Sequence, residues 1–273
     1  METLVTHHGI ARIEGDELAV VDLPYPDLSA LLADGGSLAD VDKAAVIRRL
    51  PKADLDAVAA APLALATTSV WGVGLNYHGK AALTGRAVPT SPILFLKPSS
   101  ALTTHGAPLP IPAGLTEQFD YEAEVGVVLG RALVDARPED VWDAVAGIIA
   151  ANDTTARDVM KATGTPTLAK GFPGCAPFGP TVLPLAEVTD PNAIPVASSV
   201  DGEQRQDSTT ADLIFDVPDL LARLSRYVRL EPGDVVLTGS PPGTGQDRGD
   251  YLRPGQRVTI TVGGLVPLVN TIA

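Results

Sequence analysis

The sequence lacks the features that mark several common protein classes. It has one cysteine, Cys175, which excludes an intrachain disulfide and any zinc site built from several cysteines. Its formal net charge is −13, and it has no basic stripe to attract a nucleic-acid backbone. No apolar run approaches the roughly 18 residues of a membrane span, and the N-terminus has no secretory pattern. We therefore expect a cytoplasmic protein that binds neither nucleic acid nor membranes.

Two frequent catalytic loops are also missing. The glycine-rich stretch 238–245 (TGSPPGTG) lacks the Gly-Lys-Ser/Thr ending of a P-loop, so nucleoside triphosphate binding is not expected. It also lacks the G-x-S-x-G pattern of the α/β-hydrolase nucleophile. What it offers is a run of backbone N–H donors with little side-chain bulk, which suits a carboxylate or carbonyl oxygen.

The composition is that of an ordinary globular protein, with 45% apolar residues in 273. Its 26 glycines and 24 prolines are spread along the chain, as in proteins built of many short strands and tight turns. From about residue 69 on, predicted strands end in polar residues that suit chemistry, whereas residues 1–68 have no such pattern. We therefore predict a small N-terminal domain over 1–68 and a main domain over 69–273. In the first, the patterns predict strands at 10–13 and 18–21, and helices around 28–32 and over 41–50.

The most informative stretch is 120–130 (DYEAEVGVVLG), where acidic residues alternate and then run into an apolar β-branched segment. On a strand, Asp120, Glu122 and Glu124 share one face, with Cα atoms about 6.5–7 Å apart at i and i+2. Such a face can be a solvated edge, or it can hold a cation that offsets the repulsion between the carboxylates. The stretch alone leaves both interpretations open.

Further polar residues follow apolar segments. Residues 148–151 are either a buried strand or a helix segment, and they lead to Asp153, which is either an N-cap or a third carboxylate for the same cation. Lys97 ends the strand predicted at 92–96 and either is solvated or faces an anionic ligand. Asp201-Gly202 predicts a hairpin, and Asp216 is expected to cap an amphipathic helix.

Taken together, the motifs of residues 70–273 resemble the fumarylacetoacetate hydrolase family. The resemblance rests on YEAE at 121–124, NDTTARD at 152–158, FLKPSS at 95–100, QRQ at 204–206, and LEPGDVVLTGSPPGTG at 230–245. It implies a mixed α/β, β-rich fold with a β-sandwich roll or barrel-like core, a small N-terminal domain, a homodimer and a divalent Mg²⁺ or Mn²⁺ ion.

Carried over residue by residue, the resemblance places the metal ligands at Glu122, Glu124 and Asp153 and a catalytic lysine at Lys170. Three carboxylates suit a hard, oxygen-seeking ion. The predicted substrate-binding residues are Thr238, Gly239, Arg157, Gln206 and Lys97. Asp120 matches no ligand position, so we expect it at the rim of the site or behind the ligands.

The sequence departs from the family pattern in two places, the lid that closes over the metal and the wall of the pocket. Many members carry Asn-Tyr-x-x-His-x-x-Glu, whose His and Glu form an acid/base pair, but here Lys80 and Leu83 stand at those positions. His78, two residues earlier, is a candidate base near neutral pH, and Lys80 is a second candidate catalytic residue. Met160 replaces a glutamine that is frequent in the family, which indicates a less polar pocket wall.

The chemistry that fits is activation of a 2-oxo acid or 1,3-dicarbonyl through a metal-stabilised enolate. The resemblance to the family favours hydrolysis of a C–C bond as the first hypothesis. An isomerase, tautomerase or decarboxylase follows, because the missing His–Glu pair weakens the case for water activation. A third hypothesis is a protein that binds an oxo acid without turning it over.

Overall fold

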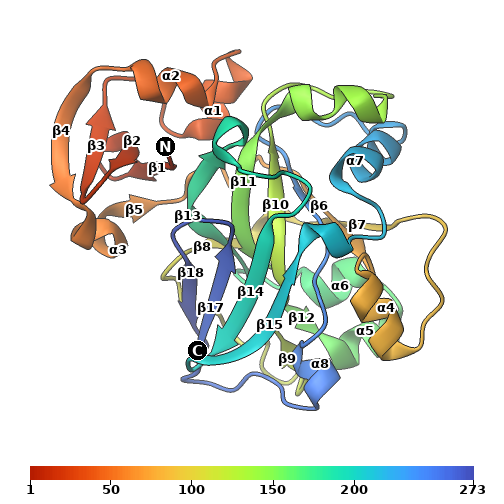
Figure 1. The fold of residues 1–273 in the computed structure, drawn as a ribbon. Helices are drawn as coiled ribbons and strands as arrows, with labels where there is room; N and C mark the ends of the chain where they lie inside the picture. Colours follow the sequence, from red (N-terminus) through yellow and green to blue (C-terminus); the bar gives the residue numbers. More distant parts are fainter.

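The apolar segments that follow the acidic residues form two central strands, β10 (Ala123–Leu129) and β11 (Val145–Asn152). They pair antiparallel, and nearly every residue of both is buried because protein covers both faces. The computed structural model describes all residues, 1–273, and shows a sheet-rich, mixed α/β protein (Figure 1). The alternative of a helix at 148–151 is therefore wrong.

The largest sheet has twelve strands and runs β4-β3-β2-β1-β13-β11-β10-β16-β6-β7, with β5 beside β1 and β8 beside β13. Its strands not yet given are β1 (Thr3–Thr6), β2 (Gly9–Glu14), β3 (Glu17–Val21), β4 (Val46–Pro51), β5 (Ala59–Ala60), β6 (Val70–Gly74), β7 (Ile93–Lys97), β8 (Leu102–Thr104), β13 (Ala176–Pro184) and β16 (Val235–Leu237).

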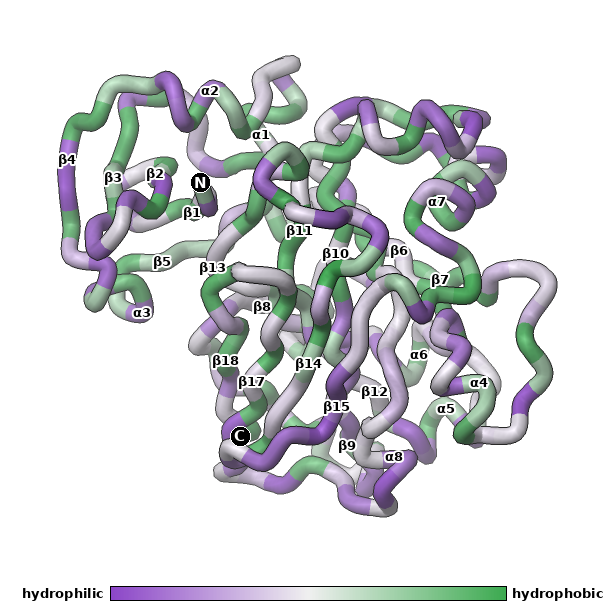
Figure 2. The backbone as a smooth tube through the Cα atoms, viewed as in Figure 1, coloured by the Kyte–Doolittle hydropathy of each residue, from purple (hydrophilic) through white to green (hydrophobic).

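A four-stranded sheet, β15-β14-β17-β18, packs against β10 and β11. Its strands are β14 (Pro195–Val200), β15 (Glu203–Thr209), β17 (Arg257–Val262) and β18 (Leu268–Thr271), and a two-stranded pair joins β9 (Phe119–Asp120) to β12 (Thr155–Ala156). Alternate residues of β17 point inward, so Val258, Ile260 and Val262 join Val125 and Val127 in the larger apolar core. Figure 2 shows green, hydrophobic residues along β10 and β11 of the large sheet and along β17 of the four-stranded sheet.

The helices are short and lie at the edges of the sheets. They are α1 (Leu28–Ala33), α2 (Leu38–Lys43), α3 (Leu55–Val58), α4 (His78–Thr84), α5 (Arg157–Thr163), α6 (Pro166–Lys170), α7 (Val217–Ser225) and α8 (Gly245–Arg248). Asp216 caps α7 by accepting a hydrogen bond from the Asp219 N–H, as predicted. The longest helix has nine residues, and none is long and apolar enough to cross a membrane.

The N-terminal segment differs from the prediction in one element. The predicted strands at 10–13 and 18–21 are β2 and β3, and α1 lies where Leu28, Leu31 and Leu32 predicted a helix. The helix expected over 41–50 is wrong, because α2 ends at Lys43 and β4 follows. Strand β4 is the outermost strand and pairs with β3, where Arg49 Nη1 lies 2.8 Å from a Glu14 oxygen and 2.7 Å from a Glu17 oxygen.

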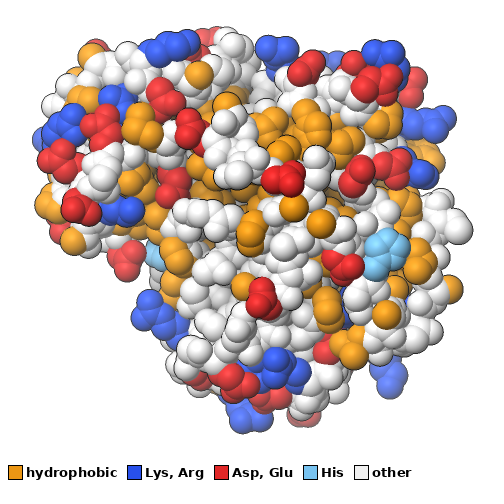
Figure 3. All heavy atoms as spheres, viewed as in Figure 1, with side chains coloured by type: hydrophobic (Ala, Val, Ile, Leu, Met, Phe, Trp, Pro, Cys, Tyr) orange, Lys and Arg blue, Asp and Glu red, His pale blue; other side chains and the backbone are white.

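The N-terminal strands continue the main sheet, since β1 pairs with β13. The hairpin predicted at Asp201-Gly202 is present and joins β14 to β15, and a second turn, at Gly263-Gly264, lies between β17 and β18. No sheet closes on itself. On the face in Figure 3, acidic and basic side chains are interspersed and no continuous basic stripe crosses it.

Candidate active site

Three carboxylates meet at the point where β10 begins and β11 ends. The antiparallel pairing sets Ala123 opposite Asn152, so Glu122 and Glu124 lie beside Asp153. One oxygen of each lies within 4.8 Å of the others. All three side chains are buried, and the Asp153 N–H donates to the Glu122 carbonyl at 2.9 Å. Asp153 is not an N-cap, since α5 begins at Arg157 after Ala156.

Three basic residues from other elements surround this cluster. Lys170, at the end of α6, contacts Glu122 and donates to Asp153 Oδ2 at 2.5 Å. Lys97, at the end of β7, is fully buried and donates to Asp153 Oδ1 at 2.5 Å and to the Lys170 carbonyl at 2.6 Å. Arg157 donates to Glu122 at 2.6 Å. Lys97 therefore holds Asp153 and Lys170 in place and is not among the residues that line the cavity.

The two glutamates have opposite electrostatic environments. Burial alone would raise the pKa of Glu122, but Arg157 and Lys170 outweigh it and hold that pKa well below its usual range. The pKa of Glu124 is raised by burial and by the carboxylates of Asp153 and Glu122. Glu124 accepts one hydrogen bond, from the Gly239 N–H at 2.8 Å, and no basic side chain is in contact with it.

This donor set suits a hard divalent cation. Three carboxylates whose oxygens lie within 4.8 Å of one another match the oxygen ligands that Mg²⁺ and Mn²⁺ prefer. A cation at this point would also offset the repulsion that raises the pKa of Glu124. The residues present therefore fit a divalent metal ion, with Glu122, Glu124 and Asp153 as its ligands.

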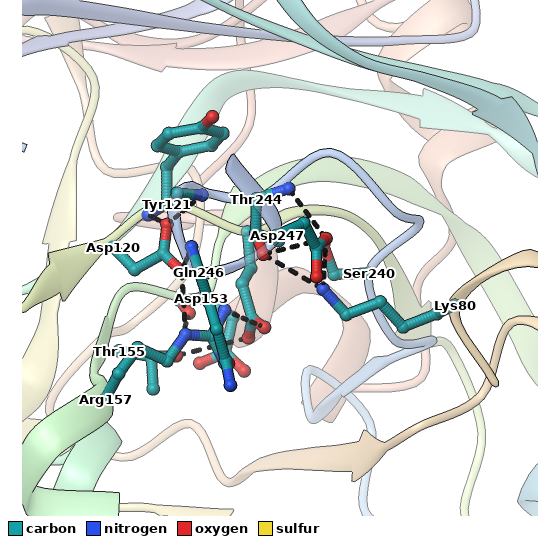
Figure 4. Close-up of polar contacts among 12 residues, drawn as sticks. Lys80, Asp120, Tyr121, Asp153, Thr155, Arg157, Ser240, Thr244, Gln246 and Asp247 are labelled. Carbon is teal, nitrogen blue, oxygen red and sulfur yellow. Dashed lines mark hydrogen bonds and ion pairs between the residues drawn. The ribbon is translucent and has the colours of Figure 1, made fainter. Parts of the chain in front are cut away.

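Asp120 does not lie at the rim. It is fully buried and accepts hydrogen bonds from Arg157 Nε at 2.7 Å, Gly245 N at 2.6 Å and Gln246 N at 3.0 Å (Figure 4). It thus joins the arginine that holds Glu122 to the start of α8. The expectation of a rim position is wrong, and the alternative position behind the metal ligands matches the structure.

The residues that replace the His–Glu pair lie on α4. Lys80 Nζ donates to Asp247 Oδ2 at 2.5 Å and to Thr244 Oγ1 at 2.9 Å, so its ammonium group is bound to the α8 turn (Figure 4). Leu83 is 60% exposed. His78 is exposed and does not line the cavity, so the structure does not bring this predicted base to the carboxylates.

The glycine-rich loop supports the cluster from behind. Thr238 Oγ1 donates to the Val125 carbonyl, and the Gly239 N–H is bonded to Glu124. Gly239 has φ +97°, and a Cβ there would lie 2.8 Å from Asn76 Cβ, so only glycine fits. Gln206 accepts from the Ala123 N–H at 3.0 Å and donates to Ser240 Oγ at 2.7 Å. None of these three predicted substrate-binding residues lines the cavity.

A cavity of about 650 Å³ opens above Glu122 and Glu124. Its lining contains five basic residues and an apolar wall, including Met160, as the sequence predicted. Sequence reasoning missed Ser240, Gln246, Arg86 and Lys161, which also line it, and Asp247 behind them. The T-x-x-D spacing of Thr244 and Asp247 is a capping-box signature that could have identified Asp247.

The chain is similar to known proteins over most of its length. The family model described as "Fumarylacetoacetate (FAA) hydrolase C-terminal" matches residues 69–273. The oxaloacetate tautomerase YisK of Bacillus subtilis is 32% identical over 216 residues, which cover 78% of this chain and 72% of that protein. A 4-hydroxyphenylacetate degradation bifunctional isomerase/decarboxylase of Salmonella dublin is 34% identical over 208 residues, 76% of this chain and 47% of that protein.

A solved structure extends the likeness to the whole chain. The fumarylacetoacetate hydrolase of Exiguobacterium antarcticum superimposes with a TM-score of 0.85 at 28% identity, covering 100% of this chain and 99% of that one. Both the matched family model and the curated relatives cover the part of the chain that carries the carboxylates. The chain therefore belongs to the fumarylacetoacetate hydrolase family.

Proposed function

We propose that the protein is a divalent-metal-dependent isomerase that interconverts keto and enol forms of a 2-oxo acid. The curated relatives named above are a tautomerase and an isomerase/decarboxylase, which supports this second hypothesis over the first-ranked C–C hydrolysis. Isomerisation, decarboxylation and C–C hydrolysis all pass through an enolate. Hydrolysis requires in addition an activated water molecule, and decarboxylation requires the loss of CO₂.

The observation that carries the proposal is the composition of the cavity. It places a buried carboxylate cluster and two held cations at one end and presents no histidine. The lid position that carries an acid/base pair in many members has Lys80, held by Asp247, and the exposed Leu83. Isomerisation of a bound oxo acid moves one proton between carbon 3 and solvent, while the cavity stabilises the negative charge of the enolate that forms. Hydrolysis needs, in addition, a base that activates water, and α4 does not supply one.

A bound Mg²⁺ or Mn²⁺ would polarise the substrate oxygens as a Lewis acid, held by Glu122, Glu124 and Asp153. Lys170 keeps its proton, because the charges of Asp153 and Glu122 outweigh burial and raise its pKa. It therefore acts as a fixed cation that stabilises negative charge on the substrate oxygen. Arg157, held by Asp120, fixes Glu122 and closes the wall beside it.

The broader organisation is part of the same proposal. We infer a homodimer, a cytoplasmic location, a β-sandwich roll around β10 and β11, and Mg²⁺ as the first choice of metal. The chain has a single cysteine and no disulfide, a pattern that is usual for proteins of reducing compartments. The packing of the four-stranded sheet on the central strands supports the sandwich arrangement.

The test follows enol oxaloacetate by its ultraviolet absorbance, with Mg²⁺ and with EDTA. We expect Mg²⁺-dependent conversion to the keto form that falls at least about a hundredfold in Glu124→Gln. Glu117→Gln, an exposed carboxylate outside the cavity, is the matched control and should keep full activity. If the protein cleaved an acylpyruvate faster than it converted the enol to the keto form, hydrolysis would be restored as the main reaction. Binding without turnover across a panel of oxo acids would favour a non-catalytic role.

A further inference from the structure

Leu75 has a backbone conformation that a leucine rarely adopts. It lies between β6 and α4 with φ +53°, in the left-handed region, where a Cβ comes too close to the following carbonyl oxygen. Two other residues that are not glycine have a positive φ, Asp135 and Asp201, and both are exposed aspartates, a residue type that tolerates this region. Glycine or asparagine would fit the backbone at residue 75 better than leucine, so the leucine side chain itself needs an explanation.

The residues on both sides of Leu75 are fixed, which forces the chain to turn at this point. Gly74 ends β6, where it pairs with β7. The side chain of Asn76 is buried and donates to the Phe215 and Thr238 carbonyls at 3.0 and 2.8 Å. A strained conformation persists where the surrounding structure over-determines it. These contacts account for the conformation at residue 75 but not for the choice of leucine.

Packing in the core does not account for the leucine either. Leu75 is half-buried and belongs to none of the apolar clusters of the core, whereas Val73 and Tyr77, on either side of it, are buried in the largest cluster. The Leu75 side chain lines the cavity instead. Residues that are strained without a gain in packing concentrate at functional sites. We therefore expect this side chain to contact the molecule that the cavity binds.

Leu75 lies at the end of the cavity that carries Glu124. The Gly239 N–H donates to Glu124 at 2.8 Å. A Cβ at Gly239 would lie 2.8 Å from Asn76 Cβ and 3.4 Å from the Val73 carbonyl oxygen. The segment that carries Leu75 therefore passes directly beside the residue that binds Glu124, and its side chain enters the cavity next to the metal-ligand end.

We propose that Leu75 is a specificity-determining residue that covers the alkyl substituent at carbon 3 of a bound 2-oxo acid. The inference rests on the proposed function, in which the carboxylate and keto oxygens of the substrate lie at the metal-ligand end of the cavity. Carbon 3 and its substituent are then the first part of the substrate that needs no polar partner. Leu75 gives this part an apolar contact, together with Val73, Ile93 and Phe95 of the same cavity wall.

The test compares 2-oxopentanoate with pyruvate, which lacks the two additional carbon atoms. Mg²⁺-dependent deuterium exchange at carbon 3, followed by NMR, measures the C–H bond that breaks, with its proton lost to solvent, and the C–D bond that forms. In Leu75→Asn, kcat/KM for 2-oxopentanoate relative to pyruvate should fall about fivefold or more below the wild-type ratio, because two methylene groups lose an apolar contact. Leu75→Met keeps that contact and should keep the ratio.

Thermal unfolding in EDTA tests the strain separately. Asparagine tolerates the left-handed region, so Leu75→Asn should raise Tm by about 2–4 °C, whereas Leu75→Met should not raise it. Leu115→Asn is the matched control, because Leu115 is 62% exposed, has no positive φ and lies outside the cavity. It should change neither Tm nor the ratio. A lower Tm in Leu75→Asn would overturn the inference, since the leucine would then serve stability.

Calorimetric titration of the Mg²⁺-loaded protein with each acid adds a readout that does not need turnover. A binding preference for 2-oxopentanoate that Leu75→Asn loses, without deuterium exchange, would retain the role of Leu75 and overturn the proposed reaction. Exchange of both acids with a ratio that Leu75→Asn leaves unchanged would overturn the role of Leu75 and retain the reaction.

Discussion

At the scale of single residues, Glu122 and Glu124 differ although they are two positions apart. Glu122 is held by Arg157 and Lys170, whereas Glu124 has one backbone donor and two carboxylate neighbours. Removing the charge from Glu122 takes one of two carboxylate partners from each of the buried cations Arg157 and Lys170, which costs about 1.5–3 kcal/mol. Removing it from Glu124 relieves repulsion. The same chemical change should therefore have opposite effects on the stability of the metal-free protein.

The prediction is measured by thermal unfolding in EDTA. Glu122→Gln should lower Tm, and Glu124→Gln should raise it, while both variants lose the stabilisation that Mg²⁺ gives the wild type. Glu117→Gln should leave both quantities unchanged because its side chain is exposed. If Glu124→Gln lowered Tm as Glu122→Gln does, the charge of Glu124 would stabilise the metal-free protein, which would contradict the prediction.

The environment of Glu124 also predicts a pH dependence. Its pKa in the folded protein is raised above the ordinary value of 4.5, first by burial and then by Asp153 and Glu122. A raised carboxyl pKa favours the protonated form in the folded state, so its stability contribution is lost as pH rises. In EDTA, the Tm advantage of Glu124→Gln over wild type should therefore grow from pH 5.5 to pH 8. Saturating Mg²⁺ should abolish that trend, and a constant difference would contradict the assignment.

At the scale of elements, the side chain of Lys80 on α4 forms an ion pair with Asp247 on α8. Lys80 is 12% exposed, and its Nζ binds Asp247, which also accepts from the Gly243 and Thr244 N–H groups. Lys80→Met should therefore loosen α4. We expect faster amide hydrogen exchange at residues 79–85 and a higher KM with little change in kcat, while α7 keeps its protection.

Lys80→Arg is the conservative comparison, because it preserves the charge and should restore most of the protection. Asp247→Asn should mimic Lys80→Met in exchange, although it also weakens the α8 cap. If Lys80→Met abolished kcat while α4 kept its protection, Lys80 would act on the substrate directly, as the sequence suggested.

The same scale shows which elements the sequence could predict. Strands β2, β3 and β17 were predictable because their apolar residues alternate or cluster between turn signals. Strand β4 was not, because an outermost strand need not bury either face: four of its six residues are exposed, and Arg49 pairs with Glu14 and Glu17 on neighbouring strands. The secondary structure of this segment is therefore determined by its pairing with β3, which is remote in sequence.

The site was predictable to the extent that it is local. Glu122 and Glu124 are two residues apart, so their convergence follows from strand geometry. Asp153 and Lys170 required the family motifs, since the sequence left Asp153 open between a cap and a ligand. The hydrogen bond of Gly239 to Glu124 joins residues 115 positions apart, and that of Lys97 to Asp153 joins residues 56 positions apart. No local sequence pattern predicts either contact.

At the scale of the whole molecule, the exposed apolar side chains are unevenly distributed. Leu83, Val88, Leu96 and Leu168 are 41–60% exposed and belong to α4, the segment after it, β7 and α6. Helix α6 packs beside β7, where Thr167 Oγ1 donates to the Leu96 carbonyl at 2.7 Å. Strand β7 is also an end of the large sheet and pairs only with β6. An apolar surface beside an open strand edge is typical of an interface.

We therefore expect the homodimer to form through this surface, and light scattering after gel filtration should give twice the 28.2 kDa chain mass. Leu96→Lys combined with Leu168→Lys should yield a monomer, because two charges cannot be desolvated at the centre of the contact without partners. Ile47→Lys is the matched control: it is 62% exposed on β4, at the opposite end of the same sheet. Dissociation by Ile47→Lys alone would move the interface to the N-terminal strands, and a monomeric wild type would exclude the dimer.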